Sequence, residues 1–193
     1  MGRPRVATPF AAWRRWTVFP LDTSGTGRRM LRLERPAAQP LGNEPRPAGV
    51  RESVAFNDDL IAHFRKNRGV ITEGPFTGRD VLLLTTTGAK SGAQRTHPLV
   101  YTKDGDRYLI IASKGGAPTH PSWYHNVRAH PEVTVEVGSQ KFRAKAIPVA
   151  GGGERRRLYD QHSAINPGFK DYERKTTRVI PAVLLERLPG SPG

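Results

Sequence analysis

The chain has 193 residues, a length that suits one domain with a hydrophobic core plus an appendage. It contains no cysteine, which excludes disulfides, thiolate nucleophiles and cysteine-bound metals, and no apolar run approaches the ~18 residues that a membrane-spanning helix needs. A formal net charge of +14 predicts an anionic partner, because such a field concentrates phosphates, carboxylates and anionic lipid headgroups at the surface.

Residues 1–50 differ in composition from the remainder of the chain. They contain nine arginines, no lysine and seven prolines, and the prolines are spaced too closely for a long helix. We expect a disordered extension without a signal peptide, because no apolar stretch of ~7 to 15 residues follows the first arginines. A basic binding arm and a translation start downstream of Met1 are the open alternatives. Residues 51–193 are expected to form the folded domain.

The folded part is expected to begin with a helix. Phe56, Leu60 and Phe64 recur every four residues and Gly69 follows as a C-cap, so an amphipathic helix begins near Ser53. Beyond it, short apolar and alternating segments bounded by turn residues are typical of strands. The expected strands cover residues 81–87, 94–101, 107–113, 132–137, 141–149 and 178–188, and the further helices cover residues 121–129, 154–163 and 169–176.

The order of these elements predicts the fold class. Most of the six strands are joined by short hairpins, such as KDGD at residues 103–106, and the helices fall at the corners. This order predicts a mainly β fold with peripheral helices (α+β), whose largely antiparallel sheet closes into a small barrel. A doubly wound fold is excluded, because too few helices separate the strands.

The segment TTTGAKSGAQR, residues 85–95, joins the first two strands and carries two glycines and two cations. It is not a phosphate-binding P-loop, because Ala89 separates Gly88 from Lys90 and a strand follows where that motif needs a helix. It could be a hairpin loop with its glycines at positive φ and Lys90 solvated. Alternatively it binds an anion together with a second cationic loop at residues 113–116, since backbone N–H groups beside lysines hold anions. The residues alone leave both interpretations open.

Other chemistry-bearing side chains give weaker signals. His120, His125 and His130 are five residues apart, which on a helix turns each about 140° from the last, so a zinc triad is not expected. No nucleophile elbow or Ser/His/Asp pattern stands out in the sequence. Trp123, near the start of the helix 121–129, either packs in the core or stacks on a planar ligand.

Several motifs together resemble a known family. The chain contains, in order, LLLTTTGAKSGAQRTHPLVY, a DGD hairpin, ASKGGAPTHPSWYHNVRAHPEVTVEV and NPGFKDYERKTTRVIPAVLLERL. This series resembles the deazaflavin-dependent nitroreductase family of actinobacteria from about residue 54 to residue 188, and residues 1–50 have no counterpart in it. The resemblance implies a split β-barrel related to flavin-binding proteins. It also implies coenzyme F-420, an 8-hydroxy-5-deazaflavin whose tail carries a phosphate and several glutamates.

The resemblance further implies which residues hold the cofactor. Lys90, Ser91 and Arg95 would bind the phosphate and glutamate tail, and Trp123 would lie against the deazaflavin ring. Relatives often have an arginine where this chain has Ala89, so one tail contact is expected to be weaker. The implied cofactor-binding residues are Ala89, Lys90, Ser91, Arg95, Thr96, His97, Pro98, Leu99, Val100, Ile111, Ala112, Ser113, Lys114, Ser122, Trp123, Tyr124, His125 and Asn126.

The acceptor side is implied by the C-terminal part of the resemblance. Asn166, Phe169 and Tyr172 would bind the acceptor, and Tyr172 would orient or protonate it as the catalytic residue. The alternative for Tyr172 is a surface tyrosine that only packs the segment carrying Asn166 and Phe169. Nitroimidazole-reducing relatives carry tyrosines where this chain has Asn166 and Phe169, which argues against activity on bicyclic nitroimidazoles.

The resulting hypothesis is an oxidoreductase that transfers a hydride from reduced coenzyme F-420 to an electron-poor acceptor such as a quinone, enone or nitro compound, without a metal and without a specific nucleic acid. We expect it in the cytoplasm, and leave open a homodimer and peripheral contact with the inner face of the plasma membrane. Two alternatives remain: an FMN-binding oxidoreductase on the same barrel, or another ligand there, and a non-enzymatic basic protein that binds anions or nucleic acid.

Overall fold

The computed structural model of the protein describes the backbone of residues 48–191 and the side chains of residues 57–191. The extension expected over residues 1–50 lies outside the described residues, apart from its last three. The elements of the described part are α1 (Ala48–Lys66), β1 (Val81–Thr87), β2 (Gln94–Asp104), β3 (Arg107–Ile111), the 3-10 turn η1 (Lys114–Gly116), α2 (Ser122–Ala129), β4 (Glu132–Val137), β5 (Gln140–Val149), α3 (Gly152–Ile165), α4 (Gly168–Arg174) and β6 (Ala182–Arg187).

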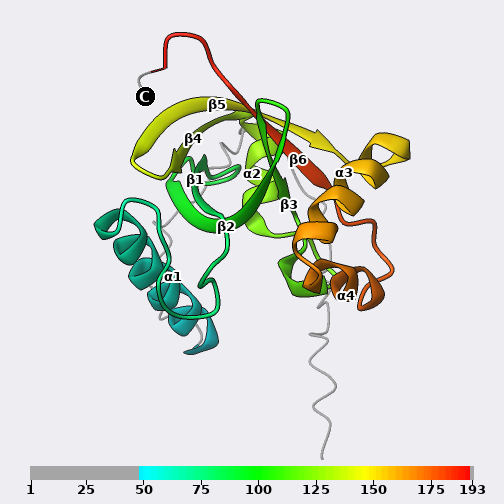
Figure 1. Cartoon of the computed structure of the whole chain (residues 1–193), viewed down its shortest axis with the longest axis horizontal. Helices are drawn as coiled ribbons and strands as arrows, with labels where there is room; N and C mark the ends of the chain where they lie inside the picture. Colours follow the sequence, from blue (N-terminus) through cyan, green and yellow to red (C-terminus); the bar gives the residue numbers. More distant parts are fainter. Residues whose placement is uncertain (1–47, 192–193) are drawn as a thin grey trace, which may run out of the picture. The chain divides into compact units, whose positions relative to one another are not determined.

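The strands of this part form one closed antiparallel barrel (Figure 1). Their order is β1-β2-β3-β6-β5-β4, and β4 pairs with β1 to complete the ring. The hairpins β1-β2, β2-β3 and β4-β5 supply half of the pairings, and β6 closes the sheet between β3 and β5. Closure removes the unpaired edges that an open sheet would expose. The mainly β fold with peripheral helices that the sequence predicts is therefore confirmed.

The apolar run at the start of β1 is explained by coverage on both faces of the strand. Leu82 and Leu84 point into the barrel interior, whereas Val81 and Leu83 pack outward against Phe64 and its neighbours on and after α1. Side chains alternate between the two faces of a strand, so a run of four buried residues needs a second apolar layer outside the barrel. In Figure 1, α1 supplies that layer on one side of the barrel, and α3 and α4 lie on the other.

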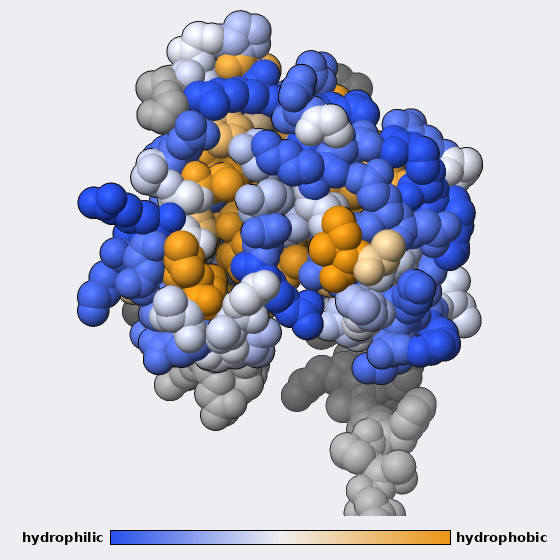
Figure 2. Space-filling model, in the orientation of Figure 1, coloured by the Kyte–Doolittle hydropathy of each residue, from blue (hydrophilic) through white to orange (hydrophobic). Residues whose placement is uncertain are grey.

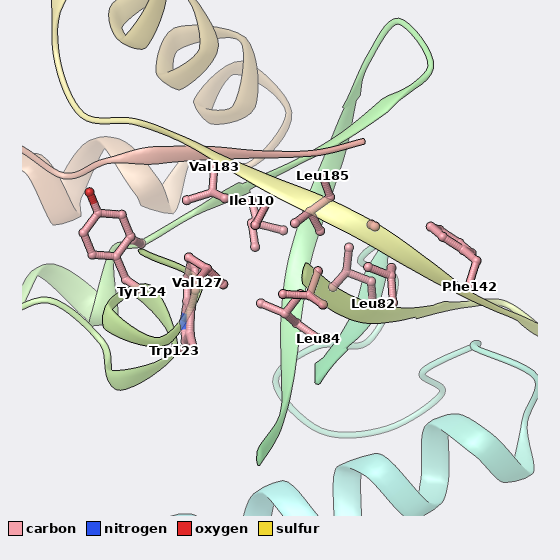
Figure 3. Close-up of a cluster of buried hydrophobic side chains, with 14 residues drawn as sticks. Leu82, Leu84, Ile110, Trp123, Tyr124, Val127, Phe142, Val183 and Leu185 are labelled. Atoms are coloured by element: carbon pink, nitrogen blue, oxygen red, sulfur yellow. The ribbon is translucent and has the colours of Figure 1, made fainter. Parts of the chain in front are cut away.

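The barrel interior is closed at one end by α2. Figure 3 shows Leu82, Leu84, Ile110 and Leu185 pointing toward one another between the strands, with Val127 of α2 beside them. Packing of this helix inside the sheet explains why its aromatic first turn is buried. The interior cluster comprises Leu82, Leu84, Ile110, Ala112, Trp123, Tyr124, Val127, Val133, Val135, Phe142, Ala144, Ala146, Val183 and Leu185.

Two elements begin four or more residues from the sequence-based expectation, and the other strands and helices agree with it to within three residues at each end. Helix α1 begins at Ala48 instead of near Ser53: it starts directly after Pro47 in the sequence, where proline is tolerated, and continues through Gly49. The last strand was expected from residue 178 but begins at Ala182. Pro181 cannot donate to a strand ladder, and the Arg178 guanidinium turns instead to loop carbonyl groups after β3. Residues 178–181 therefore form a connecting segment that packs against that loop.

The surface of the described part is mostly polar on the face shown in Figure 2. Hydrophilic side chains cover most of this face, with apolar groups visible between them in several separate places. Within the described residues, none of the helices combines the length and the apolar character that crossing a bilayer would require.

Candidate functional site

A pocket of about 500 Å³ lies where the middle of β2, the end of β3, the start of α2 and the helix α4 come together. Its walls are mainly aliphatic and aromatic, with a few polar groups at defined places, which is the composition typical of small-molecule and cofactor sites. Its lining residues are Pro75, Phe76, Arg79, Pro98, Leu99, Val100, Ile111, Ser113, Lys114, Gly115, Pro121, Trp123, Phe169 and Tyr172.

This pocket brings together two groups of residues that the sequence resemblance had assigned to different partners. Seven of its lining residues were expected to bind the cofactor, and Phe169 and Tyr172 were expected to bind the acceptor. The seven come from β2, from the end of β3 and the segment after it, and from the first turn of α2. The expected ring-binding wall and the expected acceptor-binding wall therefore face one shared space, as direct transfer between two bound molecules requires.

The α4 wall of the pocket is fixed from behind by buried aromatic contacts. The ring of Phe169 packs edge-to-face on Tyr172 and on His162, with ring centroids 5.2 Å and 4.4 Å apart. The Tyr159 hydroxyl donates to the Phe169 carbonyl oxygen at 2.7 Å, and burial raises the pKa of Tyr159 well above its ordinary value. Burial lowers the pKa of His162 to about 4, so this imidazole is neutral at pH 7. The aromatic side chains that pack behind Tyr172 are therefore uncharged at pH 7, and the buried Arg155 guanidinium that stacks on Tyr159 is paired with Glu173 of α4.

The charged groups around the pocket are all cationic. Lys114 and Arg79 line it, and no aspartate or glutamate does. The Lys114 ammonium donates to the Thr119 hydroxyl at 2.9 Å, which holds the side chain near the rim. A pocket with this charge pattern favours an anionic ligand or one that becomes negative during a reaction.

The first cationic turn, between β1 and β2, lies outside this pocket. Ala89, Lys90 and Ser91 are exposed, and in the described structure the Lys90 side chain makes no hydrogen bond or ion pair. The expectation of positive φ angles holds for Gly92, at 67°, but not for Gly88. A Cβ atom at Gly88 would lie 2.6 Å from the Ser91 hydroxyl oxygen, which can rotate away, and 3.2 Å from the Ala93 carbonyl oxygen, so a side chain here would fit only tightly. The tip of the turn is therefore open to solvent and free to meet a ligand.

Asn126 anchors the base of this turn. Its side-chain oxygen accepts from the Ala89 N–H at 3.0 Å, and its amide nitrogen donates to the Thr86 hydroxyl at 3.0 Å. Asn126 is buried on α2, less than one turn from Trp123, so one short helix touches both the first cationic turn and the pocket. The sequence resemblance counted Asn126 among the cofactor-binding residues, and in the structure its side chain supports the base of the turn.

The remaining expected site residues lie away from the pocket. Arg95, Thr96 and His97 line a groove of about 400 Å³ against α1. Burial and the nearby Arg95 charge lower the pKa of His97. Asn166 lines a smaller pocket of about 210 Å³. Of the others, Ala112 and Tyr124 belong to the barrel core, and Ser122 and His125 are exposed.

Five lining residues were not expected from the sequence. Three of them, Pro75, Phe76 and Arg79, come from the loop between α1 and β1, and Gly115 and Pro121 flank residues that were expected. The loop reads GPFTGRD, in which an aromatic residue and an arginine stand among turn formers just before a buried strand. Functional residues are frequent on loops that a rigid scaffold positions, so this composition was the available signal.

A closed antiparallel barrel with an aromatic, cation-rimmed pocket defines the class of small cofactor-binding barrels. Within the described residues, no group of three or more histidine, cysteine or acidic side chains could hold a metal ion. The chain belongs to the F420H(2)-dependent quinone reductase family, whose model matches residues 59–187.

Known relatives agree with this assignment. An F420H(2)-dependent quinone reductase of Mycobacterium tuberculosis (strain H37Rv) is 45% identical over 108 residues, which cover 55% of this chain and 72% of the relative. The solved structure of an F420-H2 dependent reductase, FDR-A, is 40% identical with a TM-score of 0.52, and covers 56% of this chain and 95% of its own. A second solved chain, described as a domain-swapped dimer, is 35% identical with a TM-score of 0.53, over 72% of this chain and 97% of its own.

Proposed function

We propose that the protein reduces quinones and similar electron-poor acceptors with a hydride from reduced coenzyme F-420, and that both molecules meet in the pocket between Trp123 and Tyr172. The observation that carries this proposal is the shared pocket of about 500 Å³, lined by residues expected on the cofactor side and by residues expected on the acceptor side. Membership of the F420H(2)-dependent quinone reductase family supports the choice of cofactor and acceptor.

The chemistry of the lining residues fits this cofactor. A flat deazaflavin ring suits the apolar wall formed by Pro98, Leu99 and Trp123. Arg95 precedes Pro98 by three residues on β2, which corresponds to about 10 Å along a strand, so a tail leaving the pocket beside β2 would reach Arg95 and then Lys90. Both cations lie in the exposed part of the turn, where they can pair with phosphate and carboxylate groups.

The residues of the chain have three tasks in this reaction. The cofactor supplies the hydride, since a 5-deazaflavin disfavours one-electron chemistry. Trp123, Phe169 and Phe76 enclose the space and exclude water from it. The Tyr172 hydroxyl is the proton donor that orients the acceptor oxygen, and Arg79 and Lys114 stabilise negative charge on that oxygen until it is protonated. One hydride and one proton together convert a quinone to a hydroquinone.

We further propose that the protein works as a homodimer and on acceptors other than bicyclic nitroimidazoles. The 35% identical chain described as a domain-swapped dimer supports the first point. Asn166 supports the second, because it lines a different pocket and its amide faces the His162 carbonyl oxygen at 3.5 Å. Peripheral contact with a membrane surface would give the protein access to lipid-soluble quinones.

Fluorescence titration with oxidised coenzyme F-420, with FMN in parallel, tests the cofactor assignment. We expect F-420 to bind and FMN to bind much more weakly, because FMN lacks the glutamate tail that the exposed cations would hold. The double variant Lys90→Ala, Arg95→Ala should lose most of the F-420 affinity without a change in thermal stability. A preference for FMN, or equal F-420 binding by the variant, would overturn the proposed cofactor site.

Reduction of menadione by reduced F-420 tests the role of Tyr172. We expect Tyr172→Phe to lower kcat by about 100-fold with little change in the affinity for F-420, because only the proton donor is removed. Tyr108→Phe is the matched control, since Tyr108 packs on Phe142 away from the pocket. An unchanged kcat in Tyr172→Phe would assign this tyrosine to packing.

A further inference from the structure

Arg178 connects the segment before β6 with the loop that follows β3. Its guanidinium donates to the carbonyl oxygens of Ser113 at 2.8 Å and Ala112 at 3.1 Å, and its Nε donates to the Ala117 carbonyl oxygen at 2.8 Å. The remaining nitrogen donates to Nδ1 of His120 at 3.0 Å. One side chain thereby holds both ends of the loop, across more than sixty positions of sequence.

The environment of Arg178 is unusual for a cation. No carboxylate in the described structure forms an ion pair with it, and burial lowers its pKa. Its charge is met by carbonyl oxygens, and the planar fork of a guanidinium can satisfy several of them at fixed angles where a lysine cannot. The bond from Arg178 also leaves Nδ1 of His120 without a proton, which fixes the tautomer of that ring.

The loop that Arg178 holds has a strained backbone. Lys114 has a φ of 49°, and Gly115 and Gly116 follow with φ of 64° and 82°. A non-glycine residue in the left-handed region persists only where its surroundings determine the conformation. Ser113, Lys114 and Gly115 all line the pocket, so the strain lies at the proposed site.

The other side of the loop rests on α4. A Cβ atom at Gly116 would lie 2.9 Å from the Tyr172 carbonyl oxygen, 3.2 Å from the Tyr172 Cα atom and 2.9 Å from the Lys175 Cβ atom. This close approach is possible only because Gly116 has no side chain. The loop is thus held between the Arg178 guanidinium on one side and the helix of the proposed proton donor on the other.

We propose that Arg178 is a positioning residue that fixes the Ser113–Gly115 side of the pocket relative to Tyr172 on α4. The inference rests on the proposed function and adds a residue that touches neither the cofactor nor the acceptor. Misplacement of bound reactants by about 1 Å can lower a rate by about 100-fold, so a side chain that sets this spacing controls the transfer step.

The outer face of Arg178 offers a control and a route for chemical rescue. It lines a second pocket of about 660 Å³, together with His120, Tyr124 and Arg128. Arg128 is exposed at the end of α2 and makes no hydrogen bond with the loop in the described structure. Arg128→Ala therefore removes the same charge from the same pocket without touching the loop.

The test compares Arg178→Ala, Arg178→Lys and Arg128→Ala by single-turnover oxidation of bound, reduced F-420 with saturating menadione. We expect about a 100-fold slower transfer in Arg178→Ala, a change of less than about 10-fold in the F-420 dissociation constant, and no change in Arg128→Ala. Arg178→Lys should restore little, because an ammonium lacks the planar fork. Ethylguanidinium in the buffer should speed Arg178→Ala and leave Arg128→Ala unaffected.

Several outcomes would overturn the assignment. Hydride transfer at the wild-type rate in Arg178→Ala or in Arg178→Lys would show that the contacts of Arg178 do not set the spacing between the Ser113–Gly115 loop and Tyr172. A loss of thermal stability with an unchanged single-turnover rate would assign Arg178 to folding alone. If Arg178→Ala does not fold, Arg178→Gln, which keeps two N–H donors, serves instead under the same criteria. Failure of the wild-type protein to bind F-420 would overturn the proposed function and the positioning role together.

Discussion

The two cationic loops beside the barrel are built in opposite ways. The turn between β1 and β2 presents Lys90 on an exposed tip, and only its base is tied to the body of the protein, through Asn126. The loop after β3 places Lys114 on the rim of the pocket, and it is gripped by Arg178 on one side and packed on α4 at Gly116 on the other.

This difference indicates that the turn between β1 and β2 attracts the ligand by charge, whereas the loop after β3 positions it. An exposed, loosely held cation can follow a flexible anionic tail, and it contributes attraction without a defined geometry. A strained loop with a fixed backbone can hold a ring at a defined distance from an acceptor. Changes in the first loop should therefore alter binding, and changes in the second should alter stability and the rate of transfer.

The largest expected effect comes from adding one methyl group to the second loop. Gly116→Ala combines a left-handed backbone with contacts of 2.9 Å to the Tyr172 carbonyl oxygen and to the Lys175 Cβ atom, and should lower the free energy of unfolding by about 4 kcal/mol. Gly92→Ala in the first loop has a similar φ and no atom within 4 Å of the new Cβ, and should lower it by only about 1 kcal/mol. Urea unfolding of both variants measures the difference. Equal losses would show that the second loop can move away from α4.

His162, which packs behind Phe169, should make the stability of the protein sensitive to acid. The pKa of His162 is about 4 in the folded protein, below the ordinary value of about 6.5, so only the unfolded chain takes up a proton between these values. The stability contributed by the neutral imidazole is complete above pH 6.5 and should fall by about 3 kcal/mol as the pH drops to 4. Unfolding free energies at several pH values should show a shallower decline for His162→Gln. The exposed His130→Gln should keep the wild-type slope, and identical slopes in all three proteins would contradict the low pKa.

The base of the first loop should respond to the loss of its anchor. Asn126→Ala removes the acceptor for the Ala89 N–H and leaves the buried Thr86 hydroxyl without its donor, so we expect a loss of about 2 kcal/mol in unfolding free energy. Thr86→Val removes only the second bond and should have a smaller effect. Coenzyme binding measured on the same variants should weaken in Asn126→Ala more than in Thr86→Val. The opposite order would mean that the anchor does not hold the turn.

The sequence was sufficient to predict the barrel but not the contacts of Arg178 with the loop after β3. The run Val81–Leu84 and the short hairpins depend on local patterning, which is why the strands and their antiparallel order could be predicted. Arg178 meets Ser113 across sixty-five positions, and no periodicity in the sequence points to such a contact. The same contact explains why the start of the last strand was predicted wrongly: Arg178 was expected to pair within the sheet, and instead its side chain binds the loop after β3.

The residues of the site divide in the same way. Motif resemblance placed Leu99, Ser113 and Tyr172 at a ligand, and the fold brings them to one pocket. It gave no position to Arg79, because the loop before β1 has turn-like composition, and only the tertiary structure shows that its aromatic and cationic side chains line the pocket. Local sequence therefore identifies the groups that carry charge or apolar surface, and tertiary packing decides which of them share a cavity.

The smallest expected effect is on ligand binding, where a deazaflavin with the anionic tail and one without it distinguish attraction by charge from placement of the ring. Lys90→Ala, Arg95→Ala should weaken F-420 binding by about 10-fold, or about 1.4 kcal/mol, because solvent-exposed charge pairs contribute up to about 1 kcal/mol each. Binding of a deazaflavin without the phosphate and glutamate tail should not change, since its ring would lie in the pocket. Fluorescence titrations at low and high salt measure both ligands, and the F-420 difference should shrink as salt screens it.

A matched double variant, Lys66→Ala, Lys145→Ala, removes two other exposed cations and leaves the turn intact. If it weakens F-420 binding as much as Lys90→Ala, Arg95→Ala does, the general positive field attracts the tail and the turn has no special part. If the tailless ligand also loses affinity in Lys90→Ala, Arg95→Ala, the first loop shapes the ring site as well. A loss confined to the tailed ligand and to the turn variant would establish that one loop recognises charge while the other sets geometry.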